Sequence, residues 1–244
     1  MFEGMYAAAA GMSAQQQQLA AISNDLANSS TTGYKSERVG FRDLLYSEVN
    51  QAGTATTVGA GAAAEVLGRN QSQGAIQGTD NPLDLAIEGA GYFTVKRPNG
   101  SVALTRDGAF ELNGRGQLTT SEGDLLDPPI TLPAGVSPSD VTINSDGTVT
   151  AAGGRALGRI TLVNVSSPDH LLADGGSLFS TTAASGPARA LAGGAIHQSA
   201  LEASNVNTST EMVQLVDTQR SYQLESSAIQ TQDQMMSIAN QLVS

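Results

Sequence analysis

Few residues of this chain have the types and spacing that catalysis requires. The two histidines, His170 and His197, have no carboxylate or cysteine at a motif spacing, so each is expected in a loop or on the surface. The parts of a Ser-His-Asp triad can lie far apart in a sequence, but no Gly-x-Ser-x-Gly elbow supports one here. The chain has no Cys, which excludes disulfides, thiolate metal sites and thiol nucleophiles. We therefore predict no catalytic residue and no enzyme.

The motifs for metal and nucleotide binding are incomplete as well. Residues 144–147, NSDG, share a few residue types with a calcium loop. An EF-hand also needs an acidic first residue and a Glu at the twelfth, and these places hold Thr142 and Gly153. The glycines at 89–91 and 114–116 do not complete Gly-x-Gly-x-x-Gly, since the sixth residue is Thr in both cases. We expect no metal and no cofactor, and a β-turn at 144–147.

The charge and the apolar content of the chain disfavour nucleic acid and membranes as binding partners. The net charge is −11 and the sequence pI about 4.4, which disfavours binding to nucleic acid or to anionic lipid. No apolar run approaches the roughly 18 residues that span a bilayer, so no membrane insertion is expected. The N-terminus carries Glu3 instead of a basic cluster, and its apolar run Ala7–Ala10 is short for a secretion signal. We expect a cytosolic chain, or one exported without a cleaved signal peptide.

Proline and glycine divide the chain into two ends that can be helical and a middle rich in turns. All eight prolines lie between Pro82 and Pro187, and the last glycine is Gly194. Apolar residues near the N-terminus recur every seven positions, the spacing of a coiled-coil seam: Met5, Met12, Leu19 and Leu26. This helix is predicted to end near Asn28. A second, short helix is predicted over residues 37–49.

The C-terminal end has the same period. Thr208 and Glu211 are spaced as a capping box and open a predicted helix of about 35 residues. Its seven-residue series is Leu215, Tyr222, Ile229, Met236 and Val243. One such stripe is also typical of an ordinary helix that faces a core. Because both ends carry one, we predict that they pair with each other and with copies of themselves.

The middle of the chain is predicted to be a β domain. Residues 83–88 alternate apolar and polar side chains, and residues 92–95 and 160–165 are further predicted strands. A hairpin turn is expected at 98–100. The predicted fold class is α+β: long terminal helices paired as a coiled coil, with a central, mostly antiparallel β domain. The predicted segments are a helical segment 1–49, an extended connector 50–82, the β domain 83–193 and a helical segment 194–244.

Three segments resemble the family of flagellar rod and hook proteins. Residues 27–35, ANSSTTGYK, resemble the N-terminal signature of the family and match it at Ala27, Asn28, Thr31, Gly33, Tyr34 and Lys35. Residues 201–222 resemble its C-terminal signature, with matches at Leu201, Glu202, Ser204, Asn205, Val206, Glu211, Met212, Val213, Gln219, Arg220 and Tyr222. Residues 105–118, TRDGAFELNGRGQL, are similar to a motif of its β domain. The resemblance covers nearly the whole chain.

The resemblance implies a structural subunit of the rod, the drive shaft of the flagellar basal body. It implies that the paired terminal helices form the inner wall of a helical tube and that the β domain packs outside it. The implied partners are further copies of the chain, other rod proteins, the hook protein, the rings around the rod and the type III export gate. The implied location is the rod that crosses the periplasm, reached without a cleaved signal peptide.

The likeness to one rod subtype and the likeness to an export signal rest on shorter motifs than the two signatures do. Residues 31–46 resemble the distal rod protein, whereas residues 81–86 have some likeness to the proximal rod protein and the connector is short for a distal one. Both subtypes stay open, with the distal one favoured. Phe41 and Leu45 fit Phe-x-x-x-Φ, where Φ is hydrophobic, which resembles the motif that the export gate recognises. The alternative is that both pack in the short second helix.

A different class of function is a secreted, adhesin-like binding module whose terminal helices oligomerise. Such a module would keep its affinity for a ligand when both terminal helices are removed. A rod subunit would lose assembly and export.

Overall fold

The computed structural model describes residues 2–44, 47–51, 54–59, 61–133, 135–151, 153–191 and 193–243. The chain divides into two compact units. The helical unit takes residues 1–27, 37–67 and 207–244, and the β unit takes residues 28–36 and 68–206. Within the described residues, no helix combines the length and the apolarity that crossing a membrane requires. The four segments predicted from the sequence stay predictions.

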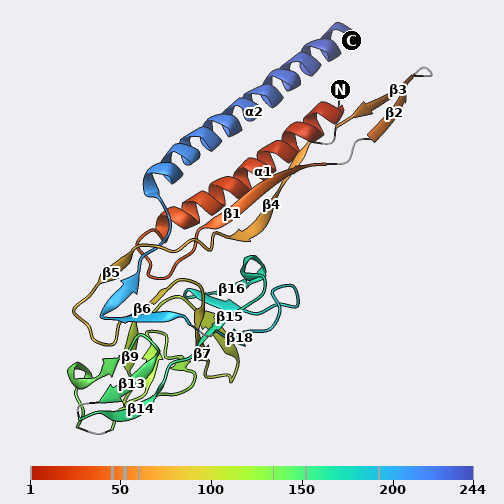
Figure 1. Cartoon of the computed structure of the whole chain (residues 1–244). Helices are drawn as coiled ribbons and strands as arrows, with labels where there is room; N and C mark the ends of the chain where they lie inside the picture. The colour runs from red at the N-terminus through yellow and green to blue at the C-terminus, as the bar shows by residue number, and fades with distance from the viewer. Residues whose placement is uncertain are drawn as a thin grey trace. The chain divides into compact units, whose positions relative to one another are not determined.

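Two long helices form most of the helical unit. Helix α1 spans Phe2–Ala27 and helix α2 spans Thr208–Val243, and the two lie side by side in opposite directions (Figure 1). Both predicted helices are confirmed, including the end of α1 before Asn28 and the length of α2, which is 36 residues. The most buried apolar residues of α1 are Ala14, Ala21 and Ile22. Two of these three are alanines, which allow a close approach between helix backbones.

The cap of α2 differs from the prediction. The side-chain oxygen of Asn207 accepts hydrogen bonds from the backbone N–H groups of Ser209 and Thr210, each at 3.1 Å. Asn207 is therefore the N-cap, because an N-cap side chain binds the second and third N–H groups of its helix. The predicted capping box of Thr208 and Glu211 is wrong by one residue. Asn207 is the stronger capping residue and precedes Thr208.

Residues 37–49 are not the predicted second helix but contribute two strands. β1, Glu37–Asp43, pairs with β4, Ala62–Arg69, and β2, Ser47–Gln51, pairs with β3, Thr54–Val58 (Figure 1). Gly40 weakens a helix at this point, and the carboxylate of buried Asp25 accepts the N–H of Glu37 at 3.1 Å. Tertiary contacts thus override the local pattern. The predicted connector also contains strands, namely β3, β4 and β5, Ile76–Gly78.

The β unit is built on a nine-stranded sheet whose pairs are all antiparallel. Its main path runs β16 (Leu172–Gly175), β17 (Leu178–Ser180), β8 (Val102–Thr105), β7 (Tyr92–Lys96), β11 (Leu125–Leu126), β10 (Leu118–Thr120) and β9 (Phe110–Leu112). β15 (Leu162–Asn164) joins β7 to β18 (Arg189–Ala190). The predicted α+β class with a mostly antiparallel β region is confirmed.

Smaller sheets complete the β unit. β12 (Thr142–Ile143), β13 (Thr148–Ala151) and β14 (Arg155–Arg159) form one sheet. β19 (Ala195–Gln198) pairs with β6 (Leu85–Glu88), and β20 (Ala200–Glu202) pairs with β5. Two short 3₁₀ turns span Pro138–Asp140 and Pro168–His170. The pairing of β20 with β5 brings the residues just before α2 beside the predicted connector.

The core of the β unit lies between these sheets. The rings of Phe93 and Phe110 meet edge to face at 5.3 Å between centroids. β6 differs from the predicted alternation, because Leu85, Ala86 and Ile87 are all fully buried. The strand predicted at 92–95 and the turns at 98–100 and 144–147 are confirmed. The strand predicted at 160–165 is shorter and spans only residues 162–164.

Candidate functional site

The two signature segments meet in the β unit at a buried group of charges, the ion-pair cluster of Lys35, Arg106 and Glu202. The Lys35 Nζ lies 2.6 Å from Glu202 Oε1, and an Arg106 Nη lies 3.1 Å from Glu202 Oε2. All three side chains are at most 5% exposed. One carboxylate thus binds two cations that are far from it in the sequence.

Local structure explains how these side chains reach one another. Gly33 has φ +66°, and a Cβ there would lie 2.5 Å from the backbone nitrogen of Asp107, so only glycine fits this turn. The Gly33 N–H donates to the carbonyl of Glu202 at 2.8 Å, which fixes the turn against the end of β20. Lys35 follows the turn, and Arg106 follows β8. The signature glycine therefore sets the position of the signature lysine.

Further hydrogen bonds surround the cluster, although the Nε of Arg106 is buried without a partner among the described residues. Lys35 Nζ also donates to the carbonyl of Ser72 at 2.7 Å, and Glu202 Oε1 accepts the N–H of Gly74 at 2.9 Å. Arg106 donates to a backbone carbonyl at 2.8 Å and lies 5.3 Å from the centre of the Tyr92 ring. Removing one partner from such a buried pair costs about 3–5 kcal/mol, because a charge is left without compensation.

Burial shifts the pKa of Lys35 and that of the neighbouring Tyr92. It lowers the pKa of Lys35, and the hydrogen bond with Glu202 opposes that shift. It raises the pKa of Tyr92 to about 12, and the nearby Arg106 charge opposes that shift. The Tyr92 hydroxyl therefore stays protonated and donates to Gln71 at 2.6 Å. These groups are buried and hold segments of the chain together.

Asn205 forms a second link beside the cluster. Its Oδ1 accepts the N–H of Ser36 at 2.8 Å, and its Nδ2 donates to the carbonyls of Asn70 and Ser72 at 2.8 and 3.0 Å. Its backbone N–H donates to Tyr34 O at 3.4 Å. Asn205 of the second signature thus binds Tyr34 of the first through its backbone, and its side chain binds Ser36 and the segment before β5.

Sequence reasoning missed several residues of this site. Arg106 and Asp107 were only members of the 105–118 motif, and Asn70 and Ser72 were part of a connector without a pattern. The Thr32 hydroxyl donates to Asp107 at 2.7 Å, and burial raises the pKa of that carboxyl. The sequence offers one signal for these residues, namely the Arg-Asp pair at 106–107 between two apolar stretches. No local pattern connects it to residue 202.

The other predicted site residues are spread over both units. Asn28 accepts a hydrogen bond from the hydroxyl of Thr31, and Ser204 accepts one from the N–H of Val206. Ala27 ends α1. The signature residues Glu211, Gln219 and Arg220 lie on α2, and the last two are exposed. The structure joins Gly33, Tyr34 and Lys35 of the first signature to Glu202 and Asn205 of the second.

The described side chains of both seven-residue series are all partly buried. Partly covered side chains are Met5, Met12, Leu19 and Leu26 on α1, and Leu215, Tyr222, Ile229 and Met236 on α2. Val243 ends α2, and its side chain lies outside the described ones. Phe41 is on β1 and is 49% exposed, whereas Leu45 lies outside the described residues.

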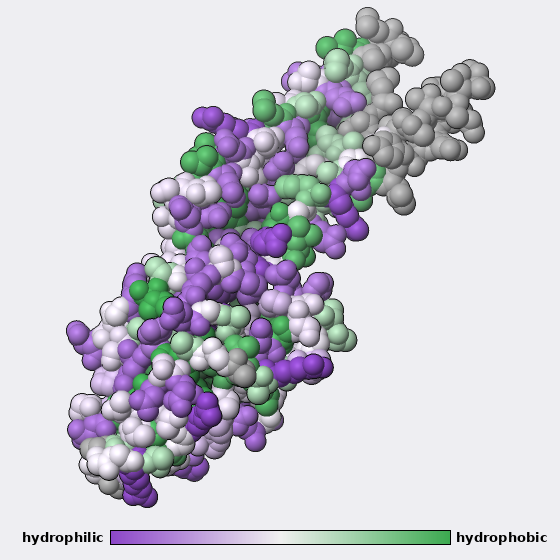
Figure 2. All heavy atoms as spheres, in the orientation of Figure 1, coloured by the Kyte–Doolittle hydropathy of each residue, from purple (hydrophilic) through white to green (hydrophobic). Residues whose placement is uncertain are grey.

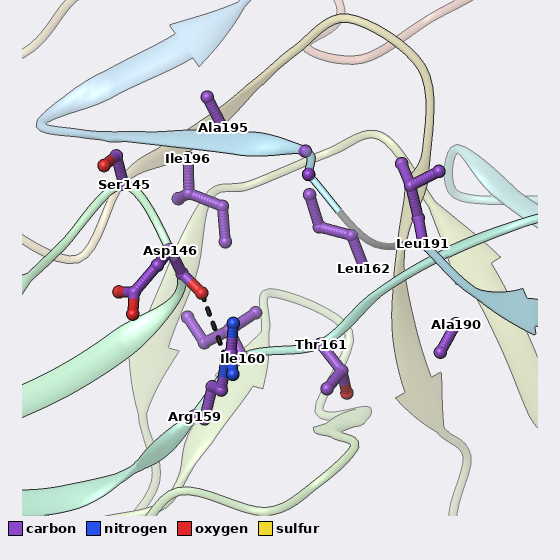
Figure 3. Close-up of a pocket in the computed structure, with 12 residues that line it drawn as sticks. Ser145, Asp146, Arg159, Ile160, Thr161, Leu162, Ala190, Leu191, Ala195 and Ile196 are labelled. Atoms are coloured by element: carbon purple, nitrogen blue, oxygen red, sulfur yellow. Dashed lines mark hydrogen bonds between the residues drawn. The ribbon is translucent and has the colours of Figure 1, made fainter.

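A groove of about 610 Å³ lies in the β unit beside β14 and β19 (Figure 3). Its apolar lining is formed by Ile160, Leu162, Leu191 and Ile196. At its rim, Arg159 donates a hydrogen bond to the backbone carbonyl of Asp146 at 3.1 Å. Asp146 is the acidic residue among the described lining residues, and its carboxylate accepts the N–H and the hydroxyl of Thr148 at 3.0 and 2.8 Å. We assign no chemistry to this groove.

Three family models match consecutive parts of the chain. A model described as flagella basal body rod protein matches residues 5–35. The D1 domain of flagellar hook protein FlgE/F/G matches residues 86–151, and the C-terminal model of flagellar basal body rod FlgEFG protein matches residues 197–242. The first and last matches include both signatures, residues 27–35 and 201–222.

Full-length relatives agree with these models. The chain is 38% identical to the flagellar basal-body rod protein FlgG of Caulobacter vibrioides, over 98% of this chain and 99% of the relative. It is 38% identical to FlgG of Borreliella burgdorferi, over 99% of both chains. It is 34% identical to the flagellar hook-basal body complex protein FlhP of Bacillus subtilis, over 98% of this chain and 99% of the relative. The chain therefore belongs to the flagellar basal-body rod protein family, and it is a structural subunit of the rod.

Proposed function

We propose that the chain is a distal rod subunit without catalytic activity, and that it polymerises through its terminal helices into a helical tube. The distal subtype is supported by relatives named FlgG and by the likeness of residues 31–46. The proposed partners are copies of itself, other rod proteins, the hook protein, the rings around the rod and the type III export gate. The predicted segments 1–49, 50–82, 83–193 and 194–244 are the proposed parts of the assembling subunit.

The observation that carries this proposal is an apolar stripe on α2. Val213, Leu224 and Met235 are 62%, 73% and 60% exposed, and they follow one another at eleven-residue intervals. Eleven residues are almost a whole number of helical turns, so these side chains lie along one line. We call these three residues the outer stripe. Figure 2 shows separate hydrophobic patches along α2 among hydrophilic ones.

α2 therefore has apolar side chains on two faces. Leu215, Tyr222 and Ile229 are partly covered, whereas the outer stripe is exposed within the chain. Exposed apolar rows of this kind are typical of protein contact surfaces. In a rod, the same contact repeats from each subunit to the next and does not form a closed ring. Every copy therefore needs an exposed surface that binds its neighbour, in addition to the contact within its own chain. We propose that the seven-residue series is the coiled-coil seam and that the outer stripe binds the next subunit.

Truncation distinguishes this proposal from a secreted binding module. Removing residues 207–244 should abolish incorporation into basal bodies and leave cells without hooks. A module whose β unit binds a ligand would retain that binding in the truncated chain. Fractionation and electron microscopy of basal bodies are the measurements. Normal hooks with the truncated chain would refute the role of α2 in assembly.

The export motif gives a separate prediction. Phe41 is half-exposed on strand β1, so the described part of residues 37–49 does not form the predicted helix. We propose that this pair is read by the export gate while the chain is unfolded. Replacing Phe41 and Leu45 together with Ala should leave the protein in the cytoplasm at normal total amount.

The readout is the amount of the chain in culture supernatant and in cytoplasm, in a strain that lacks the hook cap. Val66→Ala is a matched control, because Val66 is an exposed apolar residue on β4 outside the motif. Undiminished secretion of the double variant would exclude the export role.

A further inference from the structure

The contact between α1 and α2 contains polar residues at seven-residue spacing. On α2 they are Glu211, Thr218 and Glu225, of which Thr218 is 7% exposed and the other two are partly covered. Gln18 and Asp25 of α1 have the same spacing, and Asp25 is 2% exposed. Residues seven apart lie on one face of a helix, so this polar line runs along the contact. A buried polar group in such a line weakens the contact between the helices when it has no hydrogen-bond partner.

Glu225 contributes an unsatisfied oxygen to this line. Its carboxylate rests on Gly11 of α1, where a Cβ would lie 3.0 Å from Oε1 and 3.4 Å from Oε2. Its Oε2 is buried and has no hydrogen-bond partner among the residues that the structure describes. The absent side chain at Gly11 makes the space that this oxygen occupies. A buried carboxylate oxygen without a donor is unfavourable while the group is ionised.

No cation of the helices compensates this charge. Arg220 is the one basic residue in the sequences of α1 and α2, and it is exposed. The described titratable side chains of α1 are Tyr6, which is 74% exposed, and Asp25. On α2 the remaining ones are Glu211, Asp217, Tyr222 and Asp233. Apart from Arg220, each of these residues is acidic or a tyrosine.

The strands of the same unit contribute no compensating charge either. Their described titratable side chains are Glu37, Arg38, Arg42, Asp43 and Glu65. Arg42 lies 3.6 Å from Glu65, and both side chains are more than half exposed. Burial alone raises the pKa of Glu225. Burial also raises that of Glu211, with a smaller effect from the Asp25 charge.

We propose that Glu225 is a proton-sensitive contact, so that protonation of its carboxyl tightens the α1–α2 pair and ionisation loosens it. The protonated carboxyl has no charge to bury and gains an O–H donor. A carboxyl that binds its proton more tightly in the paired state makes pairing stronger as the pH falls. The gain begins near the raised pKa of Glu225 and is complete below the ordinary pKa of a free glutamate. The inference concerns a contact within one chain and does not depend on the assembly proposal.

The absence of Cys makes a local measurement possible. Spin labels on Ser13→Cys and Gln223→Cys, both exposed positions, report the fraction of full-length chains in which α1 and α2 are close. In the wild type this pairing should strengthen from neutral to mildly acid pH. One proton taken up on pairing changes the equilibrium by at most about tenfold per pH unit. Glu225→Gln should pair well at neutral pH and lose most of the dependence, with a remainder from Glu211.

Two further variants separate the contact from total charge. Asp217→Asn removes one negative charge from an exposed position of α2 and should keep the wild-type dependence. Gly11→Ala keeps every charge but fills the space under the carboxylate, which should move it into solvent and remove its part of the dependence. An unchanged pH dependence in Glu225→Gln would overturn the proposal. So would an equal loss in Asp217→Asn.

Discussion

Glu202→Gln is expected to destabilise the β unit by about 3–5 kcal/mol, the range for removing one partner of a buried ion pair. The substitution keeps the size of the side chain but leaves Lys35 and Arg106, both at most 5% exposed, without a counter-charge. This carboxylate is the one that binds both cations of the cluster. Urea unfolding of the purified full-length chain, followed by a probe in the β unit, measures the loss.

Glu88→Gln is the matched control in the same unit. Glu88 lies 2.6 Å from His197, but the side chains are 61% and 48% exposed. Solvent screens such pairs, which contribute about 0–1 kcal/mol. If Glu202→Gln were as stable as Glu88→Gln, the ion-pair cluster would not stabilise the β unit.

Leu224→Asp is expected to abolish rod assembly and swimming. Leu224 is the most exposed member of the outer stripe, so the isolated subunit loses little by the change. In an assembled rod the same position would bury an unpaired carboxylate against the next subunit, which is strongly unfavourable. Motility and electron microscopy of basal bodies provide the readout. Unfolding of the purified variant should match that of the wild type.

Gln223→Asp is the control for Leu224→Asp, because it adds the same charge at the neighbouring exposed position outside the stripe. It should assemble. Normal swimming with Leu224→Asp would show that the outer stripe is not part of the contact between subunits.

The sequence predicted the long helices because their signals are local. Neither end contains proline, and the apolar residues recur at helical intervals over many turns. Residues 37–49 contain a similar apolar pattern over a shorter stretch. There, pairing with another strand determines that the segment is extended and not helical. β1 pairs with β4, more than twenty residues later, and no local rule reveals that pairing.

The site was predictable in part. The signatures identified Gly33, Lys35, Glu202 and Asn205, but not what these residues bind. Glu202 meets Arg106 because β20 pairs with β5 and because Gly33 holds its turn against Asp107. Both are long-range features. Periodicity was also ambiguous on α2, where apolar residues occur on two faces and only the exposed areas separate the covered face from the outer stripe.

Photo-crosslinking from position 224 in living cells tests the assembly proposal most directly. A photoreactive phenylalanine analogue replaces Leu224, with the same replacement at Gln223 as the control. We predict covalent adducts between subunits from position 224 in purified basal bodies, and far fewer from position 223. Rods that form normally but give no adduct between subunits from position 224 would contradict assembly through this face of α2.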